Sequence, residues 1–144
     1  MMNQYLNNIQ MASLVEAIQQ AEDFSTGEIR LHIDKSTEEN SAKTAFEIFK
    51  NLGMDNTKER NAVLFHVNFE KKYLTIIGDK GIHEKVHQEF WDNLHDKITH
   101  AFSEGKYFEG LRSAILETGV ELKKFFPIKN GENPNELSNE ITFS

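Results

Sequence analysis

Residues 61–77 have the sequence NAVLFHVNFEKKYLTII, and this stretch decides the fold. From Ala62 to Val67 the apolar residues are almost uninterrupted, which predicts an interior strand covered on both faces. Tyr73 to Ile77 predicts a second strand only a few residues later. The short connection between them predicts a hairpin that turns at residues 69–71, so these two strands are expected to run antiparallel.

Another strand precedes this hairpin. From Glu28 to Asp34, isoleucine and leucine alternate with arginine and histidine, which is the period of a strand with one buried face. An apolar stripe over residues 42–52 predicts a helix between the two strands, ended by Gly53. A helical crossover makes the strands on either side of it parallel. The starts of these parallel strands and the end of the hairpin therefore share one edge of the sheet.

Helices account for most of the remaining pattern. Ser13-Leu14-Val15-Glu16 matches a capping box, which predicts a first helix from there to about Phe24, with a frayed extension back toward Leu6. Two more helical patterns cover residues 86–102 and 108–126. The order of elements predicts a three-layer α/β/α sandwich with a small mixed sheet of three to four strands and about four helices.

Length and composition describe one soluble domain. The chain has 144 residues, 38% of them hydrophobic, and no segment approaches the run of about 18 apolar residues that spans a membrane. We predict a single domain over residues 1–127 and a polar tail over residues 128–144, with a short edge strand at 140–143. The first residues have neither the basic stretch nor the apolar core of a secretory signal, so we expect a cytoplasmic protein.

Charge and cysteine content exclude several classes of function. Sixteen lysines and arginines against 23 aspartates and glutamates give a net charge of -7, which disfavours a surface that binds nucleic acid. The chain has no cysteine, which excludes disulfides, thiol nucleophiles and cysteine-ligated metals. The acidic excess is compatible with carboxylate sites for hard divalent cations.

Acidic residues gather in the loops at the shared edge of the sheet. Ca²⁺ takes six to eight oxygen ligands and Mg²⁺ about six, so carboxylates and loop carbonyls are suitable partners. We predict a Ca²⁺ or Mg²⁺ site that clamps two loops, with the ligands Asp79, Asp55, Glu59, Glu28 and Glu84. The alternative is structural, because Asp, Asn and Thr are common in loops, where they satisfy backbone groups and cap helices.

A second metal motif lies in the helical pattern after the hairpin. His83-Glu84-Lys85-Val86-His87 spells H-E-x-x-H, which on a helix puts two imidazoles on one face and a glutamate in place as the general base of a zinc peptidase. The alternative is that both histidines border the buried stripe of an amphipathic helix. The two histidines in strands, His32 and His66, are interpreted as structural residues rather than ligands.

A metal-dependent phosphatase is the alternative function for the acidic edge. The cation would act as a Lewis acid, while Arg60 or Lys80 steadied the phosphoryl oxygens. The sequence shows no positioned nucleophile, and Gly78-Asp79-Lys80-Gly81 lacks the spacing of a P-loop. Whether the chain is an enzyme stays open at this point.

Four motifs in order carry a family resemblance. They are Thr26-Gly27-Glu28-Ile29, Arg60-Asn61-Ala62-Val63-Leu64, Gly78-Asp79-Lys80-Gly81-Ile82 and Phe102-Ser103-Glu104-Gly105-Lys106-Tyr107. With them, the run from about Leu14 to Pro127 resembles a TPM domain, the family named for a plant thylakoid lumen protein, a photosystem repair protein and a nematode receptor regulator. The resemblance implies an α/β/α sandwich, binding of divalent cations, particularly calcium, at acidic loops on one edge of the sheet, and, for the plant lumen member, acid phosphatase activity.

The chain also departs from the pattern of this family. Members commonly carry a signal peptide and a membrane anchor or glycine-rich tail, whereas this chain resembles a stand-alone domain. Many members have Gly-Tyr-Gly-Leu-Glu where this chain has residues 78–82. Asp79 adds a carboxylate to that loop, which favours cation binding over a phosphate cradle.

Overall fold

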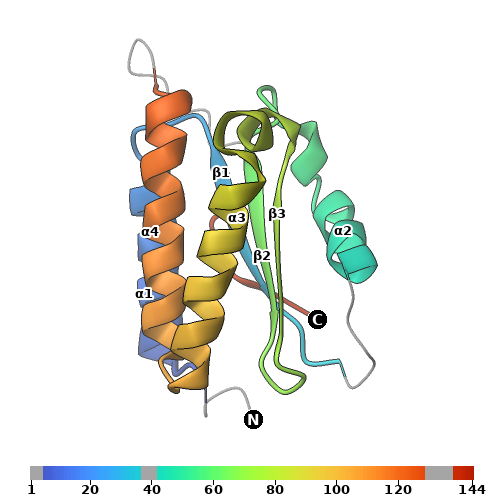
Figure 1. The fold of residues 1–144 in the computed structure, drawn as a ribbon, viewed down its shortest axis with the longest axis vertical. Helices are drawn as coiled ribbons and strands as arrows, with labels where there is room; N and C mark the ends of the chain where they lie inside the picture. The colour runs from blue at the N-terminus through green and yellow to red at the C-terminus, as the bar shows by residue number, and fades with distance from the viewer. Residues whose placement is uncertain (1–4, 37–41, 129–137) are drawn as a thin grey trace.

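A four-stranded mixed sheet lies between helices on both of its faces (Figure 1). The computed structural model describes residues 5–36, 42–128 and 138–144. Its α-helices are α1 (Asn8–Glu22), α2 (Ala42–Asn51), α3 (Lys80–Ser103) and α4 (Tyr107–Phe125). α1, α3 and α4 cover one face of the sheet, and α2 lies on the other. The predicted three-layer α/β/α sandwich is confirmed.

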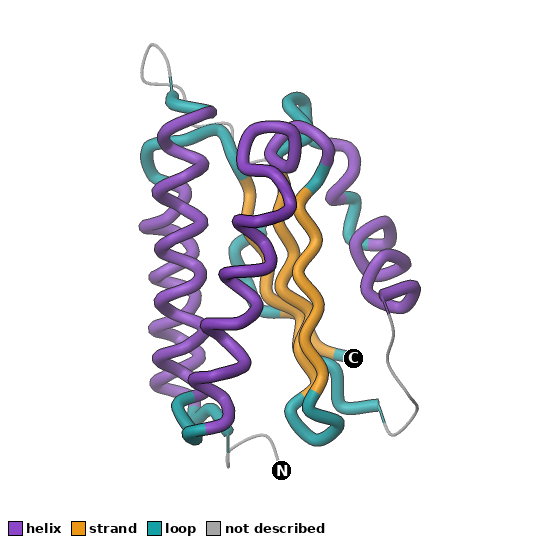
Figure 2. The backbone as a smooth tube through the Cα atoms, in the orientation of Figure 1, coloured by secondary structure: helices purple, strands orange, loops and turns teal. Residues whose placement is uncertain are grey.

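The sheet has the strand order β3-β2-β1-β4, and its strands are the orange segments in Figure 2. Its strands are β1 (Glu28–Ile33), β2 (Ala62–Asn68), β3 (Tyr73–Gly78) and β4 (Thr142–Phe143). β1 and β2 are parallel and β2 and β3 antiparallel, as the crossover and the hairpin predict. Glu28 pairs with Ala62 and Val63 pairs with Gly78, so the three acidic loops do meet at one edge.

Alternate residues of β1 and β2 face different layers. One set packs with α1, α3 and α4 in the main core and consists of Ile29, Leu31, Ile33, Val63, Phe65 and Val67. Successive side chains of a strand point to opposite faces, so the intervening residues face the α2 layer. There a smaller apolar cluster contains Phe49, Met54, Ala62 and Leu64.

The α2 face of the sheet is polar over the rest of its area. Its buried polar residues from the two parallel strands are Glu28, Arg30, His32, His66 and Asn68. Burying polar groups costs free energy unless they find hydrogen-bond partners or ligands. This face of the sheet therefore requires an explanation beyond packing.

The first helix begins at Asn8, so the predicted extension back toward Leu6 is part of the helix. Its N-cap is Asn7, whose side chain accepts from the Gln10 amide (2.7 Å), while the Gln10 side chain accepts from the Asn7 amide (3.0 Å). The prediction of a capping box at Ser13 is wrong, because Ser13 lies inside the helix. Leu6 is fully buried, so its packing fixes the chain just before this earlier start.

The last part of the chain contributes to the sheet. Residues 129–137 of the predicted polar tail lie outside the described residues, and β4 follows them. β4 runs parallel to β1 and pairs Thr142 with His32 and Phe143 with Ile33. Among residues 5–36, 42–128 and 138–144, no helix has the length and apolar character that crossing a membrane requires.

Gly119 lets α4 pack directly against α1. A Cβ atom at this position would lie 2.6 Å from the Cβ and 2.7 Å from the Cα of Ala21, so the backbone of α1 would have to move. Overpacking of this kind costs about 1–3 kcal/mol, whereas helix propensity alone favours alanine by about 1 kcal/mol. We therefore predict that Gly119→Ala lowers the free energy of unfolding, measured by urea denaturation. Ser113→Ala, at an exposed position of α4, serves as the control. An unchanged free energy of unfolding in Gly119→Ala would contradict the prediction.

Candidate metal centre

The candidate site lies where β1 and β2 end on the polar face of the sheet. The parallel register pairs His32 with His66, and their ring centroids are 5.6 Å apart. Asp34 directly follows β1 and has the same parity as His32, so its side chain reaches the same face. All three residues are at most 5% exposed. We call them the His–Asp–His cluster.

The spacing of the His–Asp–His cluster is that of potential metal ligands. One ligand atom from each residue lies within 4.8 Å of the ligand atoms of the other two. Within the part of the chain that the structure describes, this is the single group of three histidine, aspartate or glutamate residues that meets this spacing. Two imidazoles and a carboxylate are ligand types of zinc and other transition metals. The interpretation of His32 and His66 as purely structural residues thus overlooked their convergence with Asp34.

Asp34 is the charged centre of the cluster. Its carboxylate accepts from the Ser36 amide (2.8 Å), from His66 Nε2 (3.2 Å) and from the Ser144 hydroxyl. Burial alone would raise the pKa of Asp34, but these hydrogen bonds outweigh it and place the pKa below its ordinary value. Asp34 is therefore ionised at neutral pH and can act as an anionic ligand.

His66 has one ring nitrogen with a partner and one without. Burial lowers the pKa of His66, although Asp34 opposes this shift, so the ring is neutral at pH 7. A carboxylate only accepts, which places the proton of the free ring on Nε2, toward Asp34. Nδ1 has no hydrogen-bond partner among the described residues, and the side chain is fully buried. Such a nitrogen is rare in folded proteins and suggests a ligand-binding role.

His32 is held on both sides by hydroxyl groups of the β4 segment. Its Nδ1 lies 2.7 Å from Thr142 Oγ1, and its Nε2 lies 2.7 Å from Ser144 Oγ. Burial, followed by the neighbouring His66, lowers the pKa of His32 to about 4, against the opposing effect of Asp34. The ring is therefore neutral at pH 7, which is the form that binds metals.

Glu28 and Arg30 continue the polar face along β1. The guanidinium of Arg30 is 7% exposed and its Nε has no hydrogen-bond partner in the described part of the chain. Burial lowers the pKa of Arg30, and the nearby carboxylates of Glu22, Glu28 and Glu140 oppose that shift. Glu28, one of the predicted metal ligands, is 1% exposed and lies on this face of the sheet.

Asp79, at the predicted acidic edge, is engaged in the fold itself. Its Oδ2 accepts from Arg60 Nε (2.6 Å), and its Oδ1 accepts from Arg60 Nη2 (2.9 Å) and from the Lys80 amide (2.8 Å). Asp79 is thereby the N-cap of α3, and its hydrogen bonds and charge raise the pKa of Arg60. The structural alternative for Asp79, helix capping, is what the structure shows.

The other predicted ligands are spread over the same edge. Glu59 accepts a hydrogen bond from the Thr26 hydroxyl. Asp55 is partly exposed in a 3-10 turn, Met54–Asn56, and Glu84 is exposed on α3. In the described ranges, no three of the five predicted ligands have ligand atoms within 4.8 Å of one another. The topology thus joins the loops, but Asp79 and Glu59 already have hydrogen-bond partners there.

The H-E-x-x-H sequence does not lie on a regular helix. His87 has φ 65° and ψ 171°, which breaks α3 into two helical parts; the kink is visible where the upper turn of α3 changes direction in Figure 1. His83 Nδ1 accepts a hydrogen bond from Trp91 Nε1 (3.0 Å). The zinc-peptidase alternative therefore lacks the continuous helix that would place both imidazoles on one face.

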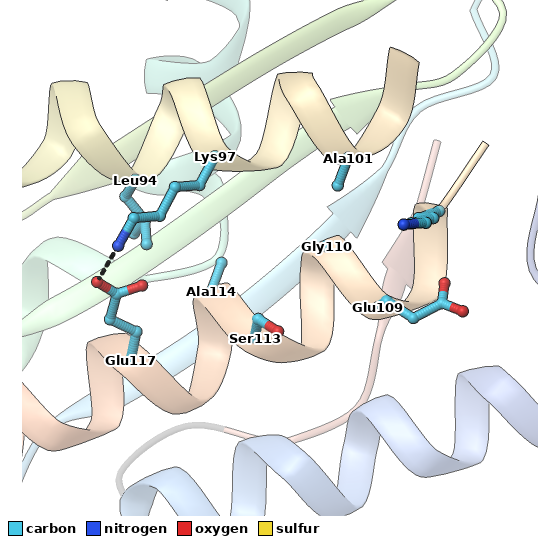
Figure 3. Close-up of a pocket in the computed structure, with 9 residues that line it drawn as sticks. Leu94, Lys97, Ala101, Glu109, Gly110, Ser113, Ala114 and Glu117 are labelled. Atoms are coloured by element: carbon cyan, nitrogen blue, oxygen red, sulfur yellow. Dashed lines mark hydrogen bonds and ion pairs between the residues drawn. The ribbon is translucent and has the colours of Figure 1, made fainter. Parts of the chain in front are cut away.

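The structure also has pockets that are not lined by the His–Asp–His cluster. Figure 3 shows one of about 240 Å³ between α3 and α4, where Lys97 donates to Glu117 (2.9 Å) above small side chains. A larger pocket of about 480 Å³ lies at the β2–β3 hairpin. Its lining includes five aromatic residues, namely Tyr5, Phe69, Tyr73, Phe102 and Tyr107. Phe69 contacts the rings of Tyr5, Phe102 and Tyr107 and belongs to the main core.

Comparisons with known proteins give a consistent result. The model of the TPM domain family matches residues 2–120. The chain is similar to the BA42 protein of the psychrophilic bacterium Bizionia argentinensis, with 38% identity, a TM-score of 0.88, and coverage of 97% of this chain and 96% of that one. It shares the fold of the N-terminal domain of a P. gingivalis protein, with 17% identity, a TM-score of 0.71, and coverage of 83% and 78%. No curated protein matches the chain.

Glu22, at the end of α1, has a buried carboxyl group close to the polar face of the sheet. It is 5% exposed, and its Oε2 accepts from the Ile29 amide (2.6 Å). Burial raises the pKa of Glu22 to about 8; the Ile29 hydrogen bond and Arg30 lower it, while Glu28 and Asp23 add to the rise. The folded chain therefore retains a proton that the unfolded chain releases above about pH 4.5.

We predict that Glu22 makes stability depend on pH. Its stabilising contribution is complete below pH 4.5 and is lost as the pH rises toward 8, a change on the order of 4 kcal/mol. Glu22→Gln cannot ionise, so this variant should become more stable relative to the wild-type protein between pH 5 and pH 8. Urea denaturation of both proteins at the two pH values measures this difference. A difference that does not change with pH would refute the prediction.

The backbone of His87 gives a separate prediction. Its positive φ lies in a region that costs a residue with a side chain about 1–3 kcal/mol. We expect His87→Gly to raise the free energy of unfolding by about 1 kcal/mol because glycine adopts this conformation without steric cost. His87→Ala is the matched control and should give no such gain. Equal stability of the two variants in chemical denaturation would show that the kink is not strained.

Proposed function

The chain belongs to the TPM domain family, and we propose that it binds a divalent metal ion through His32, Asp34 and His66. The observation that carries this proposal is the convergence of three buried ligand side chains within 4.8 Å, from two adjacent parallel strands. Nδ1 of His66 has no hydrogen-bond partner among the described residues, so it can carry the ring proton when Nε2 binds the metal. A solely structural role leaves the polar atoms of this face incompletely satisfied.

The ligand chemistry favours Zn²⁺ or a similar transition metal. Zinc binds histidine nitrogen and carboxylate oxygen at about 2.0–2.2 Å, which places tetrahedral ligand atoms about 3.3–3.6 Å apart. His66 Nε2 and Asp34 Oδ2 are 3.2 Å apart, so little movement is needed for that pair. Ca²⁺ requires six to eight oxygens, and the cluster supplies one carboxylate beside two imidazoles.

A metal at the cluster would act on the fold as well as on its ligands. It would join β1 to β2 through His32, Asp34 and His66. Asp34 is already ionised and both histidines are neutral, so the charge states suit coordination at neutral pH. Metal that binds only the folded chain stabilises it by about 2.7 kcal/mol when its free concentration is 100 times the dissociation constant. This response fits a metal-dependent regulatory or structural module.

The Ca²⁺ or Mg²⁺ site at the acidic edge is a second candidate, supported by the convergence of its three loops. A cation that used Asp79 would have to displace Arg60, which holds both carboxylate oxygens. The phosphatase alternative meets the same obstacle, because Arg60 would have to leave Asp79 to contact a phosphoryl group. The two candidate sites are far enough apart in the sheet to be tested by separate variants.

Isothermal titration calorimetry on metal-free protein tests the proposal, with Zn²⁺, Ca²⁺ and Mg²⁺ in separate titrations. We expect one Zn²⁺ per chain and a loss of affinity of at least about 100-fold in His66→Ala and in Asp34→Asn, since losing even an outer-shell partner costs about 10–100-fold. His100→Ala is the matched control because His100 is 76% exposed on α3. Circular dichroism establishes that each variant is folded.

The possible outcomes separate the two candidate sites. Zinc binding that is unchanged in folded His66→Ala and Asp34→Asn, or the absence of zinc binding in the wild-type protein, would rule out the cluster. A Ca²⁺ or Mg²⁺ response that Asp79→Asn abolishes, with the cluster variants unaffected, would assign metal binding to the acidic edge instead.

A further inference from the structure

The hydroxyl of Ser144 lies at the His–Asp–His cluster. Its Oγ is 2.7 Å from His32 Nε2 and is hydrogen-bonded to the carboxylate of Asp34. One hydroxyl group, from the residue that directly follows β4, thus bridges two of the three proposed metal ligands. The hydroxyl therefore lies against the ring nitrogen of His32 and the carboxylate of Asp34 that a shared metal ion would contact.

The hydrogen-bond directions in this network follow from its chemistry. Asp34 only accepts, so Ser144 donates its single hydroxyl proton to Asp34. Ser144 Oγ then accepts from His32 Nε2, which puts the proton of this neutral ring on Nε2. His32 Nδ1 consequently accepts from the Thr142 hydroxyl. In this arrangement Nε2 carries a proton and has no free electron pair for a metal.

We propose that Ser144 is an internal competitor of the metal, so that metal binding at His32 and Asp34 displaces the Ser144 hydroxyl and loosens β4. This inference rests on the proposed function of the cluster. Coordination through His32 Nε2 requires the other neutral tautomer, in which the ring proton lies on Nδ1 and is donated to Thr142 Oγ1. The hydrogen bond that His32 donates to Ser144 and the one that Ser144 donates to Asp34 are then replaced by two metal–ligand bonds. The site and β4 are thereby coupled.

β4 is attached weakly enough for such coupling to matter. It pairs with β1 over two residues. Beyond the side-chain bonds to His32 and Asp34, two backbone bonds hold it, from the Ser144 amide to Ile33 O (3.0 Å) and from the Lys35 amide to Ser144 O (2.7 Å). Lys35 also lies over the Phe143 ring, and the partly buried Ile141 packs against the main core. Phe143 is 47% exposed, so its burial adds little. A short strand with few buried contacts opens at low free-energy cost.

Thermodynamic linkage makes the effect reciprocal. If the metal weakens the attachment of β4, then removing the Ser144 hydroxyl must strengthen metal binding. The hydroxyl makes two hydrogen bonds, one of them to a charged carboxylate, and each has a modest net contribution. We expect Ser144→Ala to lower the dissociation constant for Zn²⁺ by about tenfold.

The test compares the wild-type protein, Ser144→Ala and Ser138→Ala in zinc titrations. Ser138 is a matched control because it lies in the same segment, where its Oγ accepts from the Glu140 amide. Hydrogen exchange of the Lys35 and Ser144 amides provides a second readout. In the wild-type protein, added Zn²⁺ should accelerate the exchange of both amides, and Ser138→Ala should behave like the wild-type protein.

Several results would overturn the inference. Weaker zinc binding in Ser144→Ala would identify Ser144 as a ligand, and unchanged binding would make it a bystander; slower or unaltered exchange of the two amides would show that β4 is not displaced. Zinc binding that is weakened by His66→Ala and unchanged by Ser144→Ala would refute the role of Ser144 and leave the proposed function of the cluster in place. Absence of zinc binding in both the wild-type protein and Ser144→Ala refutes the proposed function together with the role of Ser144.

Discussion

The buried negative charge of Asp34 organises the polar half of the structure. A carboxylate that is 5% exposed must be surrounded by donors, and the chain supplies the Ser36 amide, the His66 ring and the Ser144 hydroxyl. The hydrogen bond from His66 to Asp34 fixes the ring proton on Nε2. The hydrogen bond from Ser144 to Asp34 orients the end of β4. The charge therefore determines the hydrogen-bond directions throughout the cluster and couples β1, β2 and β4 chemically.

Much of the fold was predictable because its signals are local. The alternation in β1, the apolar run in β2 and the short hairpin to β3 define the sheet, and they required no knowledge of side-chain partners. The N-cap of α1 was predicted wrongly because two capping boxes compete in neighbouring sequence. Asn7 prevails over Ser13, and the buried Leu6 beside it is a tertiary contact that helix periodicity does not reveal.

The site was less predictable because it depends on register and on pairing between distant residues. The topology correctly brought the acidic loops to one edge, but the partner of Asp79 is an arginine whose backbone has φ 53°, a conformation that composition does not indicate. His32 and His66 meet because the parallel register pairs them, and a shift of one residue would place them on opposite faces. A signal was available in the polar residue at the centre of the apolar β2 run, His66, and in the same-face spacing of His32 and Asp34.

The division of each strand between two environments has an evolutionary consequence. Ile29, Leu31 and Ile33 build the main core, while the residues between them form the polar face. Substitution on the polar face opens no cavity in the main core, so the residues of the polar face can change while the scaffold is kept. Proteins that share this sheet can therefore carry different side chains on that face, and membership of the family does not by itself define the chemistry there.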